Sequence, residues 1–441
     1  MLFHTPIFLF CFLPIILLLY FVISKYSKKS FYFTLIAGGL IFYAWWNIYF
    51  TPLIIISIIF NYYFGNLMIK AENFSKKKII LFFSISCNVI YLGIFKYTDF
   101  IIYNINFLFN SNIQLLNLPF PLAMSFFTFQ TIAYLVDCYD GKIFNNNLKK
   151  YALFIIFFPQ LIAGPIVRYN NMMPQFENDQ NRKINHNNII LGLIVISIGL
   201  FKKTLLANNL GIIADQGFLY SENLDFISGW LTSLSFTFQI YFDFGGYIDM
   251  ATGIALMFNI KLPQNFDSPY KSTSIINFWQ RWHITLSNFL MNYIYFPTLR
   301  LFDKINFFKT MLVAIFVFLI AGIWHGPTWF YVIFGLMHGI GLVINHIYRK
   351  FINIKLYSLL GWLLTFNYVN VSLIFFRSDN ISQPINILKS MIGINGINLT
   401  TFQNNEVYLY FIFILACLIS FVFKSTYYLL KKTSDKFIQH V

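Results

Sequence analysis

The chain has 441 residues, of which 58% are hydrophobic and only 11% are charged. Soluble domains carry about 25% charged residues, so this composition excludes an ordinary soluble protein and predicts a membrane protein with many spans. Basic residues outnumber acidic ones by 31 to 16, and they gather in short segments between apolar stretches. That is the positive-inside pattern of cytoplasmic loops, and it argues against a soluble face that binds nucleic acid.

Many apolar stretches are long enough to cross a bilayer as helices, which takes roughly 17–25 residues each. We expect an all-α fold with about eleven transmembrane helices in a single membrane domain over residues 1–441, and the pattern allows up to about thirteen. The first candidates are 7–24, 31–48, 52–69 and 79–95, followed by a less regular group at 98–110, 118–136 and 151–167. The others are 188–207, 228–258, 308–324, 329–347, 357–376 and 407–424.

The basic loops predict how the chain is oriented. If the first two basic segments are cytoplasmic, the first span runs inward and the N-terminus is extracytoplasmic. The segments that this scheme places in the cytoplasm are 25–30, 70–78, 299–310, 348–355 and 424–441. The polar segment 378–406 then forms an extracytoplasmic loop.

The segment 262–300 does not fit a simple span. It is bounded by Pro263 and Pro297 and carries Arg281 and His283 in its middle. Polar sequence with helix-breaking prolines is tolerated at membrane depth only where it is buried in protein or lines a cavity. We therefore expect re-entrant or horizontal helices here, with His283 inside the protein.

Two short motifs place a histidine against tryptophans, and each is a candidate functional site because ionisable groups at bilayer depth are expensive to keep. In the motif Gly322–Pro327 (Gly-Ile-Trp-His-Gly-Pro), proline predicts that the helix ends or kinks near His325. A histidine there is suited to general-base work on a hydroxyl. The alternative is a histidine that satisfies carbonyl groups freed at the kink.

The second motif is Phe278–His283 (Phe-Trp-Gln-Arg-Trp-His). The imidazole of His283 could orient an acyl group or polarise its carbonyl, as hydrogen-bond donors do in oxyanion stabilisation. Arg281 could bind a phosphate or meet lipid headgroups. Trp279 and Trp282 crowd the same run.

His338 lies thirteen residues beyond His325, which is about 20 Å along a continuous helix. Gly335 and Gly339 form a small-xxx-small pattern typical of close helix packing, so we interpret His338 as a packed histidine with satisfied hydrogen bonds.

Asp243 and Asp249 lie in the aromatic and glycine-containing run 239–249, which suggests a tightly packed helix break. Buried carboxylates need partners, so each aspartate is either half of an ion pair, with Arg281 or another basic residue, or a catalytic group.

Several common signatures do not occur in the sequence. There is no Walker-type loop, G-x-S-x-G elbow or H-E-x-x-H motif, and the four cysteines have no zinc or disulfide spacing. An ATPase, a usual serine hydrolase and a zinc protease therefore lose support, and we expect no metal site.

Four motifs together resemble the membrane-bound O-acyltransferase (MBOAT) family. They are 278–287, the Trp-His-Gly box at 324–326, the run 241–249 and the Leu-Pro-Gln-Asn-Phe run at 262–266. More narrowly, these motifs resemble its bacterial branch, which comprises alginate and peptidoglycan O-acetyltransferases and teichoic-acid D-alanyl transferases. Further motifs resemble the alginate and peptidoglycan acetylation subgroup of that branch. These lie at 42–46, 95–97, 125–131 and 159–165. Leu373 departs from the pattern, which has a tryptophan at a position that looks like packing.

The resemblance implies a fold of about eleven spans plus re-entrant helices around a central tunnel. It implies that His325 is the catalytic histidine and His283 the second polar position of the active site. His325 would act as the general base or, alternatively, carry the acetyl group covalently. His283 would position the donor carbonyl or the acceptor. The candidates for lining the substrate site or donor tunnel are Trp279, Arg281, Trp282, Trp324, Asp243 and Asp249.

The implied reaction passes an acetyl group from a cytoplasmic thioester, acetyl-CoA or an acyl carrier, across the bacterial inner membrane for O-acetylation of a polysaccharide such as alginate or peptidoglycan. No bound cofactor is expected. The expected partners are membrane lipids and a periplasmic acetyltransferase, and no nucleic acid. One alternative is D-alanyl transfer to teichoic-acid-type polymers. Another is a transporter or flippase, which predicts inverted repeats that the sequence does not show.

Overall fold

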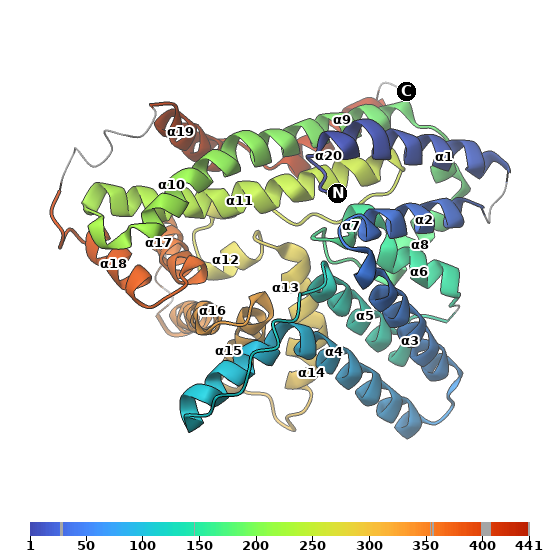
Figure 1. Cartoon of the computed structure of the whole chain (residues 1–441), viewed down its shortest axis with the longest axis horizontal. Helices are drawn as coiled ribbons and strands as arrows, with labels where there is room; N and C mark the ends of the chain where they lie inside the picture. The colour runs from blue at the N-terminus through green and yellow to red at the C-terminus, as the bar shows by residue number, and fades with distance from the viewer. Residues whose placement is uncertain (27–29, 145, 353, 355–356, 398–406, 440–441) are drawn as a thin grey trace. The chain divides into compact units, whose positions relative to one another are not determined.

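The computed structural model of the chain describes residues 1–26, 30–144, 146–352, 354, 357–397 and 407–439, and it contains helices but no strands over these ranges (Figure 1). The all-α prediction is confirmed. The final residues of the predicted outer loop, 398–406, lie outside the described residues.

Six helical segments in the described ranges are long and apolar enough to cross a membrane. They are Ile48–Lys70, Phe74–Phe109, His186–Leu219, Phe307–His325, Trp329–Ile352 and Ser358–Arg377. A seventh is possible if Val407–Val422 and Thr426–Lys432, which meet at 53°, form one broken span. These segments identify a multi-span membrane protein, and the count of about eleven spans stays a prediction.

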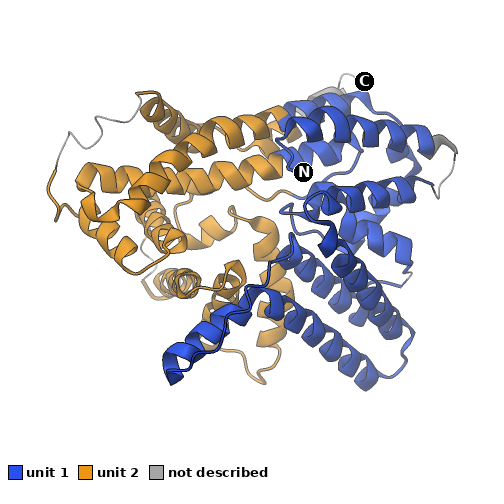
Figure 2. Cartoon of the chain, in the orientation of Figure 1, with its two compact units in different colours: residues 1–196, 250–263 blue, residues 197–249, 264–441 orange. Residues whose placement is uncertain are grey.

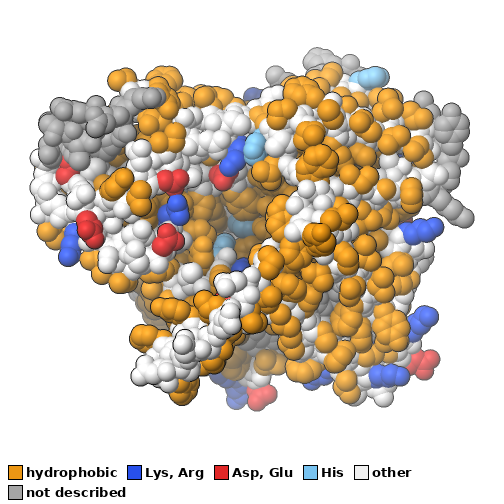
Figure 3. All heavy atoms as spheres, in the orientation of Figure 1, with side chains coloured by type: hydrophobic (Ala, Val, Ile, Leu, Met, Phe, Trp, Pro, Cys, Tyr) orange, Lys and Arg blue, Asp and Glu red, His pale blue; other side chains and the backbone are white. Residues whose placement is uncertain are grey.

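The described chain divides into two compact units, which interleave in sequence (Figure 2). Unit 1 comprises residues 1–196 and 250–263, and unit 2 comprises residues 197–249 and 264–441. Hydrophobic side chains cover much of the visible surface of each unit (Figure 3). Exposed aromatic residues such as Phe82 and Phe107, at 75% and 76% exposure, suit a surface that meets lipid.

In the described residues, unit 1 contains helices α1 to α8, and unit 2 contains α10 and the helices from α12 onward. The helices of unit 1 are α1 (Leu13–Tyr26), α2 (Ser30–Ala44), α3 (Thr51–Lys70), α4 (Phe74–Phe109), α5 (Met124–Tyr139), α6 (Leu148–Ile156), α7 (Phe158–Leu161) and α8 (Tyr169–Glu177). The helices α9 (His186–Leu200) and α11 (Phe226–Met257) contribute residues to both units.

The helices of unit 2 include the hairpin that carries His325. They are α10 (Asn208–Leu219), α12 (Ile275–Trp279), α13 (Ile284–Leu290), α14 (Phe296–Leu299), α15 (Phe307–His325), α16 (Trp329–Ile347), α17 (Ser358–Arg377), α18 (Ser382–Met391), α19 (Val407–Val422) and α20 (Thr426–Gln439). Short 3-10 or π-helical turns are η1 (Phe8–Phe12), η2 (Ile48–Phe50), η3 (Asp179–Arg182), η4 (Phe201–Ala207), η5 (Ser221–Asn223), η6 (Pro269–Lys271), η7 (Met291–Tyr295) and η8 (Tyr348–Ile352).

The predicted boundary between spans 79–95 and 98–110 is wrong, because α4 continues through Lys96. The ammonium of Lys96 lies 3.3 Å from the Ser125 hydroxyl, and Thr98 donates to a carbonyl of its own helix at 2.7 Å. With these polar groups satisfied, the helix has no reason to break there. Residues 110–123 are not helical. The helix in the predicted span 118–136 therefore begins only at Met124.

Two more boundaries are corrected. The predicted span 151–167 divides into α6 and α7 because Pro159 opens a new first turn. The predicted span 188–207 continues through the π-helical turn η4 to Leu219.

The helix break predicted at the paired glycines of 239–249 is also wrong, since α11 is continuous. A methyl group on Gly246 would lie 2.8 Å from the carbonyl oxygen of Gly199. The glycine therefore permits close packing of two helices, which is its other common use in membrane helices.

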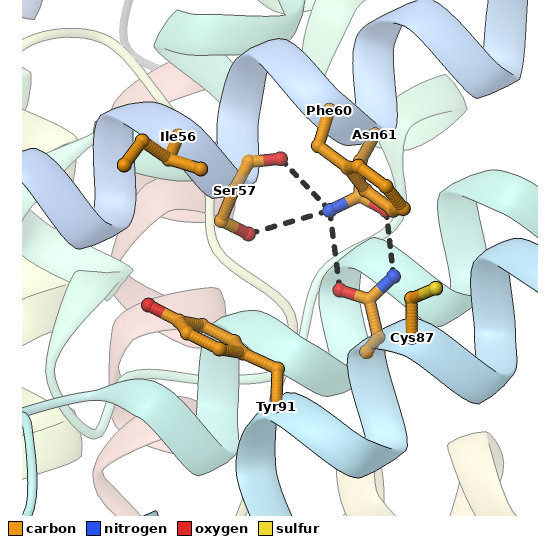
Figure 4. Close-up of a pocket in the computed structure, with 7 residues that line it drawn as sticks. Ile56, Ser57, Phe60, Asn61, Cys87 and Tyr91 are labelled. Carbon is orange, nitrogen blue, oxygen red and sulfur yellow. Dashed lines mark hydrogen bonds between the residues drawn. The ribbon is translucent and has the colours of Figure 1, made fainter.

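A buried polar pair joins α3 to α4 inside unit 1 (Figure 4). Asn61 donates to Asn88 at 3.1 Å, and Asn88 donates back to Asn61 at 2.7 Å. Their remaining N–H groups donate to Ser57 and Ser84. The pair borders a cavity of about 210 Å³, but its donors are used within the helix pair.

Candidate active site

His325 is the last residue of α15, as the Gly-Pro sequence predicts. Gly326 continues in extended backbone, and α16 begins at Trp329. A side chain on Gly326 would collide with the ring of Tyr331, so the turn needs glycine. The helix end places the imidazole of His325 among aromatic rings, 5.1 Å from Phe376 and 5.8 Å from Phe334 between ring centroids.

His283 lies at a break between α12 and α13, where its backbone is left-handed, with φ 44° and ψ 53°. Positive φ is uncommon for a residue other than glycine, and such strain is held in place by its surroundings. Two backbone hydrogen bonds hold it here. Ile284 donates to the carbonyl of Asn265 at 3.0 Å, and Asp267 donates to that of Arg281 at 2.9 Å.

The side chain of Asn265 determines which nitrogen of His283 carries the proton. The backbone N–H and the hydroxyl of Thr285 reach Asn265 Oδ1 at 3.1 and 2.8 Å. A backbone N–H can only donate, so the facing amide atom is the oxygen. His283 Nδ1 lies 3.2 Å from the same oxygen and must therefore be the protonated nitrogen. Nε2 of neutral His283 is left with its lone pair.

His283 and Asn265 are both buried side chains. His283 is 3% exposed and Asn265 is 1% exposed. Neither His283 Nε2 nor Asn265 Nδ2 has a hydrogen-bond partner among the described residues. One is an acceptor and the other is a donor, so a ligand with both kinds of group would complete them.

The three central histidines of unit 2 are linked through aromatic rings. The ring of Trp324 lies 6.4 Å from His283 and 4.9 Å from His325. The ring of Phe334 lies 5.8 Å from His325 and 4.5 Å from His338. The estimate of about 20 Å between His325 and His338 is therefore wrong, because it assumed a continuous helix. The chain instead folds back after His325 into a close α15–α16 hairpin.

Close approach of α15 and α16 depends on small residues. A methyl group on Gly335 would collide with the carbonyl of Phe318, and Gly339 lies against Ile315. The small-xxx-small interpretation of this segment is confirmed.

His338 is a buried histidine whose two nitrogens both have partners. The indole N–H of Trp279 donates to Nδ1 at 3.2 Å. Ser372 Oγ lies 2.9 Å from Nε2 and donates its own proton to the carbonyl of Val369. The protonated Nε2 of His338 is then the donor to Ser372. The prediction of a satisfied, packed histidine is confirmed.

The remaining candidates of the Phe278–His283 motif lie around the same segment. Trp282 stacks on Phe278, with ring planes 15° apart. Arg281 donates to the carbonyl of Asp267 at 3.3 Å. Burial and the positive charges of Arg281 and Lys424 lower the pKa of the Lys271 ammonium. The Asp267 carboxylate acts on the same pKa in the opposite direction, so this part of unit 2 holds three basic groups and one acidic group.

The aspartates of α11 pair with neighbouring lysines and not with Arg281. Asp243 lies 2.5 Å from Lys203, and Asp249 lies 2.6 Å from Lys202. Thr426 donates to Asp249 at 2.8 Å. Both aspartates thus have the ion-pair partners that carboxylates in membrane helices need.

Asn265 is the residue that the sequence interpretation did not single out. It lies in the run 262–266, which carried part of the family resemblance, but no spacing rule connects it to His283 eighteen residues later. Within the described residues, no three His, Cys, Asp or Glu side chains lie close enough together to hold a metal ion.

Comparison with known proteins identifies the family of the chain. The model of the membrane-bound O-acyltransferase family matches residues 142–377. The chain is 44% identical to a peptidoglycan O-acetyltransferase of Helicobacter pylori, over 90% of this chain and 81% of that protein. It is 36% identical to a probable alginate O-acetylase AlgI of Pseudomonas syringae, over 86% of this chain and 73% of that protein. A teichoic acid D-alanyltransferase of Streptococcus thermophilus is 29% identical over 58% of this chain and 68% of that protein.

A multi-span helical protein with histidines at helix breaks is a candidate membrane enzyme. The chain belongs to the membrane-bound O-acyltransferase family and is an acyltransferase. The transporter alternative is set aside on these grounds.

Proposed function

We propose that this protein passes an acetyl group from acetyl-CoA on the cytoplasmic side to an extracytoplasmic hydroxyl, for O-acetylation of a peptidoglycan-type polysaccharide. The observation that carries the proposal is the ring-linked pair His283 and His325 at two helix breaks of an acyltransferase. The similarity to a peptidoglycan O-acetyltransferase over 90% of the chain favours acetyl over D-alanyl transfer, for which the related protein matches a shorter stretch.

His325 is the proposed general base, which takes the proton from the reacting hydroxyl. A positioned base of this kind contributes about 10²–10⁴-fold to a rate. For His283 the sequence left two roles, orienting the donor carbonyl or orienting the acceptor. The lone pair on Nε2 favours the acceptor, because it can receive an N–H or O–H but cannot polarise a carbonyl oxygen.

The aromatic and charged candidates have supporting roles in this proposal. Trp324 contacts both imidazoles, Trp282 packs against Phe278 in the segment that carries His283, and Trp279 donates to His338. Lys271, Arg281 and Lys424 outnumber the Asp267 carboxylate that acts on the same ammonium, and this excess of positive charge suits the phosphate groups of a CoA thioester. Asp243 and Asp249 balance lysines of η4 and need not touch a substrate.

The proposed setting is the bacterial inner membrane, with the N-terminus extracytoplasmic. The tunnel that the family resemblance implies would let the slim pantetheine arm reach a site that charged CoA cannot enter. A periplasmic acetyltransferase is the proposed partner that completes transfer to the polysaccharide, and the segment 378–406 is its proposed docking point on the outer side. Its residues 398–406 lie outside the described structure.

The test replaces His325 by alanine in the native host. We expect acetyl esters on the cell-surface polysaccharide to fall to background while the protein level in the membrane stays unchanged. Hydrolysing the isolated peptidoglycan and measuring released acetate identifies the polymer that loses its esters. Full acetylation without His325 contradicts the catalytic assignment, and loss of esters from another polymer alone contradicts the acceptor.

A further inference from the structure

We propose that Asn265 is a further catalytic residue, whose side-chain N–H groups bind the oxygen of the acyl carbonyl. This inference rests on the proposed acyl transfer from a thioester. The atoms that carry it are Asn265 Nδ2 and His283 Nε2, a donor and an acceptor that are both buried and both without a partner in the described structure.

The orientation of the carboxamide follows from its neighbours. Three donors converge on Asn265 Oδ1, two from Thr285 and one from His283. The oxygen is therefore saturated, and the opposite atom of the amide must be the NH₂ group. A buried amide nitrogen without an acceptor is unfavourable unless a ligand completes it.

The position of that nitrogen suits a reacting acyl group. Asn265 Nδ2 and His283 Nε2 each lie two covalent bonds from the contact between Oδ1 and Nδ1. Backbone hydrogen bonds from Ile284 and Asp267 tie the two chain segments together. Donor and acceptor are thus held on one rigid unit, as preorganised stabilisation of a developing charge requires.

The step balances without a further reactant. The acceptor hydroxyl oxygen bonds to the thioester carbonyl carbon while His325 takes the hydroxyl proton. The π electrons of the carbonyl move onto its oxygen, which receives hydrogen bonds from Asn265 Nδ2. The oxyanion then collapses, the carbon–sulfur bond breaks, and the leaving thiolate takes the proton from His325. Ester and free thiol are the products.

The matched control is Asn370, a second buried asparagine of unit 2. Its Oδ1 accepts from Ser233 and Thr237 at 2.8 and 2.6 Å, and its Nδ2 has no partner in the described residues. No histidine hydrogen-bonds to the Asn370 side chain in the contacts described. Asn370→Asp therefore places a carboxylate at a buried asparagine, as Asn265→Asp does, but leaves the proposed site unchanged.

The experiment compares two unreactive CoA compounds on the purified full-length protein in nanodiscs. One is the ketone analogue of acetyl-CoA in which a methylene replaces the sulfur, and the other is S-ethyl-CoA, which has no carbonyl. We expect the wild type to bind the ketone roughly 2–10-fold more tightly, as one hydrogen bond allows. Asn265→Asp and Asn265→Ala should remove this preference, and Asn370→Asp should keep it.

Turnover provides the second readout. Asn265→Asp keeps an acceptor for Thr285 and His283 but loses the N–H donors, so the acetyl-transfer rate should fall on the order of 10²-fold. A variant that keeps both its rate and its preference for the ketone overturns the assignment. Equal binding of both compounds by the wild type also overturns the assignment. That outcome does not depend on whether the variants fold. A wild type that binds neither compound contradicts the CoA donor itself.

Discussion

The asparagine pair Asn61 and Asn88 of unit 1 and the single Asn265 of unit 2 differ in whether their hydrogen bonds are complete. In unit 1, every side-chain N–H of Asn61 and Asn88 finds an acceptor within the α3–α4 pair. In unit 2, Asn265 fills its oxygen with three donors and leaves its nitrogen without a partner in the described residues. The first arrangement joins two helices, and the second leaves the N–H groups of Asn265 available to a ligand.

The histidines of unit 2 repeat this difference. His338 has a partner at each ring nitrogen, Trp279 and Ser372. His283 has one partner at Nδ1 and none for Nε2 within the described chain. A polar group inside membrane protein is costly unless it is satisfied or serves a function. The completed networks are therefore assigned to structure. Asn265 and His283 are assigned to chemistry because an open donor and an open acceptor lie on one hydrogen-bonded pair. By contrast, no histidine bonds to the side chain of Asn370 in the contacts described, although its nitrogen is also open.

The largest expected loss of acetyl transfer comes from replacing His283 by glutamine, and the same substitution at His338 should have a much smaller effect. His283→Gln removes the imidazole whose Nε2 lone pair is proposed to orient the acceptor. A misplacement of about 1 Å can cost about 10²-fold in rate, so we expect acetyl transfer to fall by about that factor. At His338, glutamine can still accept from Trp279 and donate to Ser372, so the loss should stay below about tenfold. Surface acetyl esters, normalised to protein in the membrane, measure both.

Equal losses from the two glutamine variants would remove the distinction between an open and a completed histidine. A circular dichroism spectrum and detergent melting curve for each purified variant show whether a loss reflects folding. Retained transfer in His283→Gln would contradict a role for that imidazole at the reacting groups.

Local sequence rules predicted the features that depend on neighbouring residues. Gly326 and Pro327 correctly predict the end of α15 at His325. The all-α fold follows from composition and from the length of the apolar stretches. The small-xxx-small pattern at Gly335 correctly predicts a close helix contact.

Features that depend on distant contacts were missed or wrong. Lys96 looked like a boundary because its contact with Ser125 lies 29 residues away. The distance from His325 to His338 depends on the turn of a hairpin, which spacing along one helix cannot represent. Asn265 escaped notice because only the pairing of residues 265–267 with 281–284 brings it to His283.

A single substitution breaks the completed asparagine pair in unit 1. Asn61→Leu leaves Asn88 with a carbonyl oxygen and an N–H that have lost their partner. An unsatisfied buried group of this kind costs about 1–3 kcal/mol, so the free energy of unfolding in an SDS titration should fall by that amount. The transfer rate of the folded protein should not change, because Asn61 and Asn88 use their donors within the helix pair.

The smallest effect is expected from removing both members of that pair. In Asn61→Leu with Asn88→Leu, no amide is left unpaired, and two apolar side chains face a largely apolar cavity between α3 and α4. Replacing both partners of a hydrogen bond by apolar groups can be nearly neutral, so the double variant should be more stable than either single one. The coupling free energy from the SDS titrations of all four proteins measures this directly. A double variant destabilised by the sum of the single effects would mean that the amides stabilise the helix pair independently, and buried polar groups in this protein could then not be sorted by whether their hydrogen bonds are complete.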